Sequence, residues 1–358
     1  MQKVAVIGAG VVGSTIAATL SARGHTVTVL DAGQPGHAVS EASFAWVNAN
    51  YRKRPASYRE LNRRAVQTHH RWRREGKAPW FYPTGSLAVT GGTGGQESME
   101  AAAHEDEPIE ELGGSELRQR FPDLGPGVDH AYFHPTEGWV DTRHQIAHQL
   151  STAVDAEVRT SCPVTRIVPS NNGHGVALHT AGGRIHAFHT VVITAGNGAA
   201  PLLRDLVAVP LLTTGSGTAR IGMTIETEPL DTPPTTVLRS PDVSIRPTAE
   251  GGAVIADHAT AANFSHEDPD LWSLPRVLLD RAAAIMPDLS PARIARVRVS
   301  ERVMPPDGLP VIGRLHPGVL TVLMHSGVTL APLVSEYIAD ELESRPVPEL
   351  DAYRPSRF

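Results

Sequence analysis

Short apolar runs followed by glycine turns predict an α/β protein. Residues 3 to 7, Lys-Val-Ala-Val-Ile, are typical of a buried parallel strand, and residues 11 to 23 change to an Ala- and Leu-rich composition that predicts a helix. Gly24 ends that helix, because glycine adopts a left-handed cap at the least cost, and Thr26 to Leu30 form the next strand. We predict a βαβ unit whose right-handed crossover places the two strands side by side.

Two later blocks repeat this order of strand, turn and helix. An apolar strand over residues 190 to 194 ends in a glycine turn, and another over 319 to 324 is followed by a turn at 325 to 327 and a helix over 330 to 342. Short strands separated by turn residues precede the first of these blocks, over 158 to 168, 175 to 180 and 184 to 188.

The three separated blocks predict one discontinuous domain. We expect a Rossmann-like, cofactor-binding domain with a parallel sheet, built from residues 1–81, 139–205 and 301–358. Short β-like runs joined by Pro-rich connections lie between its parts. They predict an α+β substrate-binding domain with a mostly antiparallel sheet, inserted as residues 82–138 and 206–300.

The composition predicts an ordinary soluble protein and narrows the classes of function. A formal net charge of -6 argues against a nucleic-acid partner, because nucleic-acid-binding proteins gather Lys and Arg on one surface. The arginines between residues 63 and 74 have helical spacing and predict a solvated helix face. The 17 histidines show no ligand spacing, so we expect no metal site.

The single cysteine and the lack of a long apolar run bear on location. Cys162 cannot form an internal disulfide, which fits a reducing compartment, and its place in an expected strand favours an inert buried thiol. No apolar run approaches about 18 residues, and no basic segment with a following cleavage site precedes the first strand. We expect a cytoplasmic protein without a membrane span.

The turn from Gly8 to Gly13, Gly-Ala-Gly-Val-Val-Gly, is the strongest chemical signal. It lies between a strand and a helix, and Asp31 closes the second strand eighteen residues after Gly13. Gly8 permits the tight turn, Gly10 lets the backbone approach a pyrophosphate, and Gly13 lets helix and strand pack closely. Asp31 can accept a hydrogen bond from a ribose hydroxyl. These residues alone serve NAD and FAD equally well.

Four segments together resemble the D-amino acid oxidase and glycine oxidase superfamily of flavoproteins. They are the N-terminal block, Thr194-Ala195-Gly196, the run from Pro306 to Gly313 (Pro-Asp-Gly-Leu-Pro-Val-Ile-Gly), and the run from His325 to Pro332 (His-Ser-Gly-Val-Thr-Leu-Ala-Pro). The resemblance implies FAD, with its ADP half on the first βαβ unit and its isoalloxazine at the domain boundary.

The resemblance also implies which residues contact FAD. Ala42-Ser43 resembles the loop that touches the pyrophosphate and flavin, Val164 the strand residue whose backbone holds adenine, and Gly327 to Leu330 the helix start facing the flavin pyrimidine. The segments where relatives attach flavin covalently hold no matching Cys or His, so noncovalent FAD is expected. The expected set is Gly8, Ala9, Gly10, Val11, Val12, Gly13, Asp31, Ala32, Ala42, Ser43, Val164, Ala195, Gly196, Ser326, Gly327, Val328, Thr329 and Leu330.

Arg302 is the candidate for binding a substrate carboxylate. It stands five residues before Asp307-Gly308, the spacing at which amino acid oxidases of this family place such an arginine, and a guanidinium meets a carboxylate with two charge-assisted hydrogen bonds. The alternative is a structural arginine that bridges the two domains. Arg246 is a second anionic contact or a surface arginine.

Four further residues are candidates for the pocket. Trp46 and Asn48 follow the flavin-contacting loop and either wall the pocket or, for Trp46, belong to the core. His325 is either a loop histidine held by backbone or a proton-transfer group. Sarcosine-oxidase-like relatives use a lysine to activate oxygen, but residues 252–258 contain none, which leaves His258 as a cationic substitute and oxygen in doubt as the acceptor.

The resemblance implies oxidation of a carbon-nitrogen bond next to a carboxylate in an amino acid or N-substituted glycine. Hydride would pass from the α-carbon to flavin N5, and the imine would hydrolyse to an oxo acid. The electron acceptor is O2 or another molecule. The alternatives are an amino acid dehydrogenase with a non-oxygen acceptor, a flavin-binding subunit of a hetero-oligomeric amine dehydrogenase, and a plain NAD-dependent dehydrogenase.

Overall fold

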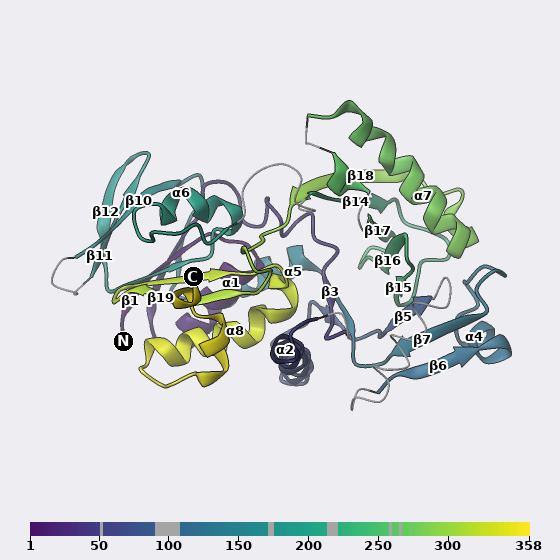
Figure 1. Cartoon of the computed structure of the whole chain (residues 1–358), viewed down its shortest axis with the longest axis horizontal. Helices are drawn as coiled ribbons and strands as arrows, with labels where there is room; N and C mark the ends of the chain where they lie inside the picture. The colour runs from purple at the N-terminus through teal and green to yellow at the C-terminus, as the bar shows by residue number, and fades with distance from the viewer. Residues whose placement is uncertain (51–52, 90–107, 171–174, 213–220, 258–259, 265–266) are drawn as a thin grey trace.

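The structure, a computed structural model, describes the chain except for residues 51–52, 90–107, 171–174, 213–220, 258–259 and 265–266. Two large sheets dominate it, one of six strands and one of eight (Figure 1). No helix among the described residues is both long and apolar enough to cross a membrane. Among the residues that the structure describes, no group of three or more His, Cys, Asp or Glu side chains could hold a metal ion.

The six-stranded sheet has the order β19-β20-β13-β1-β2-β9. Its strands are parallel except β19, which runs antiparallel to β20. Val4 to Ile7 are all buried, as expected for a strand covered on both faces. The strands are β1 (Lys3–Ile7), β2 (Thr26–Leu30), β9 (Glu157–Arg159), β13 (Thr190–Ile193), β19 (Val311–His316) and β20 (Val319–Leu323).

Helices from both ends of the sequence pack together over this sheet (Figure 1). Ile16 and Leu20 of α1 share one apolar cluster with Leu330 and Leu333 of α8 and with Leu61 of α2. The bounds are α1 (Val11–Ala22), α2 (Ala56–Arg74), α5 (Thr142–Thr152), α6 (Ala199–Leu203) and α8 (Gly327–Leu342).

The eight-stranded sheet has the order β18-β14-β17-β16-β15-β5-β7-β6 and is antiparallel except where β15 pairs with β5. Helix α7 (Leu274–Ile285) packs on it through a second apolar cluster (Figure 1). The other elements of this sheet and its surroundings are β5 (Ser86–Val89), β6 (Glu110–Gly113), α4 (Gly114–Arg120), β7 (His130–His134), β14 (Ile221–Thr227), β15 (Val237–Arg239), β16 (Val243–Pro247), β17 (Ala253–Asp257) and β18 (Ile294–Glu301).

Two three-stranded sheets complete the described strands. One consists of β3 (Trp46–Val47), β8 (Gly138–Val140) and β4 (Phe81–Tyr82), and the other of β10 (Val164–Pro169), β11 (Val176–Thr180) and β12 (Gly183–Phe188). Short 3₁₀ helices lie at Gly196–Gly198, Ala261–Asn263, Pro269–Ser273, Pro287–Leu289, Pro348–Tyr353 and Pro355–Arg357.

The structure confirms the α/β class, with a parallel Rossmann-like sheet and a mostly antiparallel second sheet. The strand expected over residues 158 to 168 is wrong, because β9 and β10 belong to different sheets and Ser161, at φ 51°, turns the chain between them. Cys162 lies in this connection and is partly exposed, not buried in a strand. Helix α8 begins at Gly327, earlier than expected. The domain boundaries stay a prediction.

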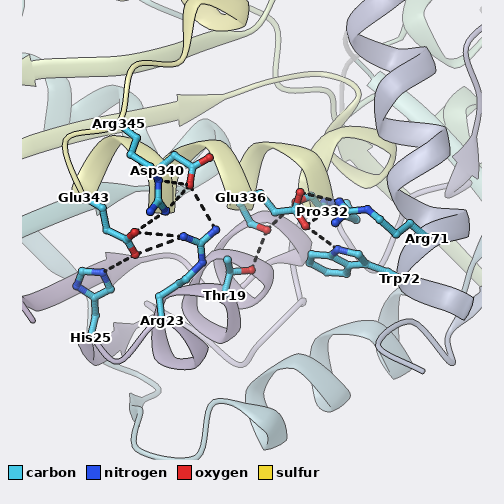
Figure 2. A network of polar contacts seen from close by, with 11 residues as sticks. Thr19, Arg23, His25, Arg71, Trp72, Pro332, Glu336, Asp340, Glu343 and Arg345 are labelled. Atoms are coloured by element: carbon cyan, nitrogen blue, oxygen red, sulfur yellow. Dashed lines mark hydrogen bonds and ion pairs between the residues drawn. The ribbon is translucent and has the colours of Figure 1, made fainter. Parts of the chain in front are cut away.

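Polar contacts join α8 to both α1 and α2 (Figure 2). Arg23 donates to Asp340 at 3.3 Å and to Glu343 at 3.2 Å, at the ends of α1 and α8. Between α8 and α2, Glu336 accepts hydrogen bonds from Arg71, at 2.7 Å, and from the indole nitrogen of Trp72, at 2.8 Å. Figure 2 shows Glu336 on α8 facing these two side chains of α2.

Replacing Glu336 with alanine should lower the free energy of unfolding by about 1 to 3 kcal/mol, because it leaves the N–H of the buried Trp72 indole without its acceptor. Urea denaturation measures the change. Glu60→Ala is the matched control. It removes an exposed carboxylate of α2 that pairs with Arg63 and Arg64 of that helix, and it should cost at most about 1 kcal/mol. Equal losses in the two variants would contradict the role assigned to Glu336.

Candidate functional site

The glycine turn joins the end of β1 to the start of α1 and leaves no room for a side chain at Gly8 or Gly13. Gly8 has φ 105°, and its N–H donates to the Leu30 carbonyl at 2.8 Å. A Cβ on Gly13 would lie 1.8 Å from the carbonyl oxygen of Gly8 and 2.5 Å from Oγ1 of Thr194. Helix α1 therefore begins in direct backbone contact with the end of the parallel sheet.

Asp31 ties this turn to the end of β2. Its Oδ2 accepts from the backbone N–H of Ala9 at 2.6 Å, and its Oδ1 accepts from that of Gly33 at 2.8 Å. Each carboxylate oxygen has more than one lone pair, so both can still accept from a ribose hydroxyl. Ala32, next to Asp31, is exposed. The Cys162 N–H donates to the Asp31 carbonyl at 2.8 Å, which brings the segment leading to Val164 beside the end of β2.

The end of β13 lies against the same turn. Oγ1 of Thr194 donates to the carbonyls of Ile7 at 2.9 Å and Gly8 at 3.0 Å. A Cβ on Gly8 would lie 2.9 Å from Cα of Ala195, and one on Gly196 would lie 3.4 Å from Cγ2 of Val303. Ala195-Gly196 therefore lies between the glycine turn and the segment that carries Arg302.

The loop after β2 approaches from another side. Oγ of Ser40 accepts from the N–H of Val11 at 3.1 Å, and the carbonyl of Ala42 accepts from Oγ1 of Thr224 at 3.3 Å, on the eight-stranded sheet. Oγ of Ser43 accepts from the N–H of Ala45, which has φ 57°. A non-glycine residue in this left-handed region costs about 1 kcal/mol or more, and such strain gathers at functional sites.

These residues fit an extended dinucleotide such as FAD. Gly10 and Val12 are partly exposed at the start of α1, where backbone N–H groups and the helix dipole favour a phosphate. A Cβ on Gly327, the first residue of α8, would lie 3.3 Å from Cγ2 of Val12, so the starts of α1 and α8 are neighbours. A ligand bound at the glycine turn would continue past Val12 to the first turn of α8.

Lys53 and Tyr58 both donate to the side chain of Ser326, just before α8 begins. Oγ of Ser326 accepts from Nζ of Lys53 at 2.7 Å and from the hydroxyl of Tyr58 at 2.8 Å, and it does not cap the helix. The first N–H groups of α8, from Gly327 to Thr329, therefore keep their favourable field for negative charge on a bound ligand.

His69 of α2 holds the first turn of α8 in place. Its Nε2 lies 3.1 Å from the carbonyl oxygen of Val328 and 3.0 Å from that of Thr329, so Nε2 carries the proton and donates. The side chain is fully buried, and desolvation lowers the pKa of His69 to about 4. The imidazole is therefore neutral at pH 7.

His69 should make the protein less stable in mild acid. In the unfolded chain His69 takes up a proton near its ordinary pKa of 6.5, whereas in the folded chain it does so only near pH 4. The free energy of unfolding is therefore highest above pH 6.5 and falls as the pH drops to about 4. The full loss is about 3 kcal/mol. Urea denaturation at several pH values should show a shallower fall for His69→Gln than for the control His70→Gln, at the neighbouring, partly exposed position. Parallel curves would refute this.

Arg302 and His325 lie near each other at the start of α8. Burial lowers the pKa of Arg302, and the nearby Asp257 opposes this change. Its guanidinium packs over Gly222 of β14, where a Cβ would lie 3.2 Å from Nη2. Desolvation, Lys53 and Arg302 together lower the pKa of His325 to about 4. His325 is nevertheless exposed, so its imidazole is accessible from outside the chain.

Trp46 and Asn48 also reach the first turn of α8. Oγ1 of Thr329 donates to the carbonyl of Trp46 at 3.3 Å and accepts from the N–H of Asn48 at 3.4 Å. The Trp46 indole donates to Oε2 of Glu137 at 2.9 Å and stacks under Arg239, whose Cζ lies 4.0 Å from the ring centroid. Trp46 is partly exposed, and Asn48 is buried.

Three further charged residues lie near this turn and were not predicted from the sequence: Lys53, Glu137 and Arg239. Glu137 is buried, accepts from Oγ of Ser86 at 2.5 Å and from the Trp46 indole, and has its pKa raised by desolvation. Desolvation lowers the pKa of Lys53 to about 8. Only contacts between residues far apart in the sequence bring these side chains together, so no local pattern marks them.

Arg246 lies among a different set of charged residues. Its Nε donates to the Phe44 carbonyl at 2.5 Å, and its Nη1 donates to the Pro247 carbonyl at 2.7 Å. Burial lowers the pKa of Arg246 to about 10. It lines a polar cavity with Glu41, Ser43 and Arg298, among others. Its contact with a substrate anion stays a prediction, and His258 lies outside the described residues.

Comparisons with known proteins identify the family. The model of the DAO family, described as FAD dependent oxidoreductase, matches residues 3–341. Glycine oxidase of Pseudomonas putida is 25% identical over 99% of the chain and 98% of its own length. The bifunctional protein ThiO/ThiG of Trichormus variabilis is 26% identical over 100% of the chain, which spans only 55% of that protein.

The fold agrees with this assignment. The crystal structure of glycine oxidase from Geobacillus kaustophilus matches with a TM-score of 0.83 over 100% of both chains, at 21% identity. Because the family model covers nearly all of the chain, the protein belongs to the DAO family of FAD-dependent oxidoreductases, and its cofactor is FAD.

Proposed function

We propose that the protein oxidises a carbon-nitrogen bond next to a carboxylate, in an amino acid or an N-substituted glycine. The observation that carries the proposal is the position of Arg302, a partly buried guanidinium that packs over Gly222 of β14 and acts electrostatically on His325, just before the start of α8. The similarity to glycine oxidase of Pseudomonas putida supports an amino acid substrate. The imine product would hydrolyse to an oxo acid and release ammonia or an amine.

The residues of the chain bind and orient the substrate. FAD, when bound, would supply a two-electron acceptor for the hydride that leaves the α-carbon. Arg302 holds the carboxylate with two charge-assisted hydrogen bonds, which fixes the direction of the C–H bond. His325 is neutral at pH 7, so it does not repel a protonated amine and can accept a hydrogen bond from it. The start of α8 favours negative charge nearby.

Anaerobic mixing with a panel of amino acids and N-substituted glycines tests this function. A substrate should bleach the flavin absorbance near about 450 nm, because the two electrons stay on the flavin when oxygen is absent. A yellow protein that no compound of the panel reduces would sink the proposal. Bleaching of the isolated chain would also exclude the alternative in which the protein is only the flavin-binding subunit of a larger amine dehydrogenase.

A dehydrogenase that passes electrons to an acceptor other than oxygen is the second candidate. It is favoured by the sequence of β17 and the residue before it, Gly252 to Asp257, which contains no lysine where sarcosine-oxidase-like relatives are expected to carry one. Measuring oxygen consumption alongside the reduction of an artificial electron acceptor separates the two. An oxidase consumes one O2 per substrate oxidised, whereas a dehydrogenase needs the added acceptor.

Acid precipitation should release all of the flavin into the supernatant. The only cysteine, Cys162, lies beside Asp31 at the end of β2, where the ADP half is expected, and is therefore remote from the isoalloxazine. The absorbance spectrum of the supernatant and of the redissolved pellet measures the result. Yellow colour that stays with the pellet would show a covalent bond and refute the noncovalent assignment.

A further inference from the structure

The segment of residues 40–48 connects the starts of the two helices between which FAD is expected. At one end, Oγ of Ser40 accepts from the N–H of Val11, at the start of α1, at 3.1 Å. At the other end, the N–H of Asn48 donates to Oγ1 of Thr329, in the first turn of α8, at 3.4 Å. The 40–48 segment therefore runs along the path expected for the cofactor, and a change in its conformation would change how FAD fits.

Ala45, within this segment, has a backbone conformation that is unfavourable for any residue but glycine. Its φ of 57° lies in the left-handed region. Its N–H donates to Oγ of Ser43 at 3.0 Å, and the carbonyl of the same peptide, that of Phe44, accepts from Nε of Arg246 at 2.5 Å. The Ala45 carbonyl accepts from the N–H of Val140 at 3.0 Å. The peptides on both sides of Ala45 are thus held from outside, and these contacts offset the strain.

Arg246 differs from the other partners of these peptides because it belongs to the eight-stranded sheet. It is buried in β16, and its Nη1 donates to the carbonyl of Pro247 in the same strand at 2.7 Å. Its Cζ lies 6.0 Å from the ring centroid of Phe44 and 4.9 Å from that of Trp139. A guanidinium held by its own strand and by two aromatic rings keeps Nε in one place, so it can fix the Phe44 carbonyl.

Hydrogen bonds and ion pairs hold the 40–48 segment against this sheet. A polar cavity there has Glu41 of the segment and Arg246 of the sheet among its lining residues. Thr224 of β14 donates to the Ala42 carbonyl at 3.3 Å, and Arg298 of β18 pairs with Glu41 at 2.8 Å. Because a cavity borders the segment on this side, losing a polar contact leaves the segment room to relax.

We propose that Arg246 is a positioning residue for the cofactor, which acts through the Phe44 carbonyl to keep Ala45 left-handed and the 40–48 segment in the shape that binds FAD. This role goes beyond the proposed function, because it concerns the cofactor and holds whichever substrate is oxidised. It also differs from a contact between Arg246 and a substrate anion, since two of the three guanidinium nitrogens already donate to main-chain carbonyls.

Dilution of the holoenzyme, with the release of FAD followed by its fluorescence, tests the proposal. Arg246→Met should weaken FAD binding by about ten-fold or more, because it removes a charge-assisted hydrogen bond and lets the segment relax. Arg246→Lys keeps the charge and one donor and should retain part of the affinity. Arg276→Met is the matched control. It removes an exposed arginine of α7 that pairs with Asp280, and it should leave the affinity unchanged.

Ala45→Gly separates an action through the segment from a general loss of structure. Glycine adopts a φ of 57° at little cost, so the segment no longer has to be held against the preference of its own backbone. Ala45→Gly should therefore strengthen FAD binding by Arg246→Met about five-fold or more, the factor that matches the cost of a left-handed residue with a side chain. It should change the affinity of the wild-type protein little. The dissociation constants of the four proteins measure this coupling.

Unchanged FAD affinity in Arg246→Met would overturn the proposal, and weaker binding of methylthioacetate by that variant at full FAD occupancy would assign Arg246 to the substrate instead. Losses that simply add in the double variant would overturn it as well, because Arg246 would then not act through Ala45. If Arg246→Met does not fold, Arg246→Lys takes its place, and Ala45→Gly should reverse its loss. Failure of every amino acid to reduce the flavin would end the proposed function and leave this inference standing.

Discussion

Gly13→Ala is expected to yield little folded protein and no bound FAD. The added Cβ would lie 1.8 Å from the carbonyl oxygen of Gly8, and backbone cannot move aside as a flexible side chain can. Helix α1 would have to separate from β1, which breaks the apolar contacts between them and widens the turn. We expect a loss of about 3 kcal/mol or more in the free energy of unfolding. The melting temperature and the ratio of flavin to protein measure it.

Gly127→Ala is the matched control for this substitution. Nothing lies within 4 Å of a Cβ at Gly127, and its backbone is not in the left-handed region, so this variant should keep its flavin and its melting temperature. A Gly13→Ala protein that bound one FAD per chain would show that α1 does not need this close approach. The assignment of the turn as the cofactor site would then be wrong.

Arg302→Ala should lower catalytic efficiency by about thirty-fold to a thousand-fold. Losing a bidentate, charge-assisted contact at a partly buried site costs on the order of 2 to 4 kcal/mol in transition-state binding. Arg302→Lys should restore only part of this, because a point charge lacks the fork geometry. Stopped-flow measurement of flavin reduction gives the rate and the substrate affinity separately.

An amine analogue without the carboxylate is the discriminating substrate for Arg302. Arg302→Ala should impair oxidation of the acid far more than oxidation of the analogue, because only the acid loses its partner. Equal losses for both, with unchanged flavin content and melting temperature, would show that Arg302 does not bind the carboxylate. Arg246 would then be the next residue to test in the same way.

The local parts of the fold could be predicted from the sequence. A strand, a glycine turn and a helix follow one another within the first 22 residues, so the pattern of apolar residues and the backbone demands of Gly8 were enough. The strand expected over residues 158 to 168 failed for a physical reason. Apolar periodicity cannot show that a chain leaves one sheet for another, and here Ser161 turns it between β9 and β10.

Some residues of the candidate site could likewise be predicted from a local pattern, and others could not. Arg302 could be proposed because its spacing to Asp307-Gly308 is local, although its role stays a prediction. Lys53 could not be predicted, because its partner Ser326 is 273 positions away. A lysine among other basic residues in a loop is typical of a solvent-exposed surface. Arg239 and Glu137 likewise acquire their surroundings only when β15 and the segment before β8 fold against Trp46.

The packing of α1 against α8 has a consequence for biosynthesis. Thr19 of α1 donates to Ser335, 316 positions later, and the two helices share one apolar cluster. A growing chain therefore exposes the apolar face of α1 until α8 has left the ribosome, and such long-range closure is slow and prone to aggregation. FAD bound between the starts of these helices would stabilise the chain only after this step. The amount of folded enzyme in a cell should thus depend on flavin supply and on chaperones that shield α1 while translation finishes.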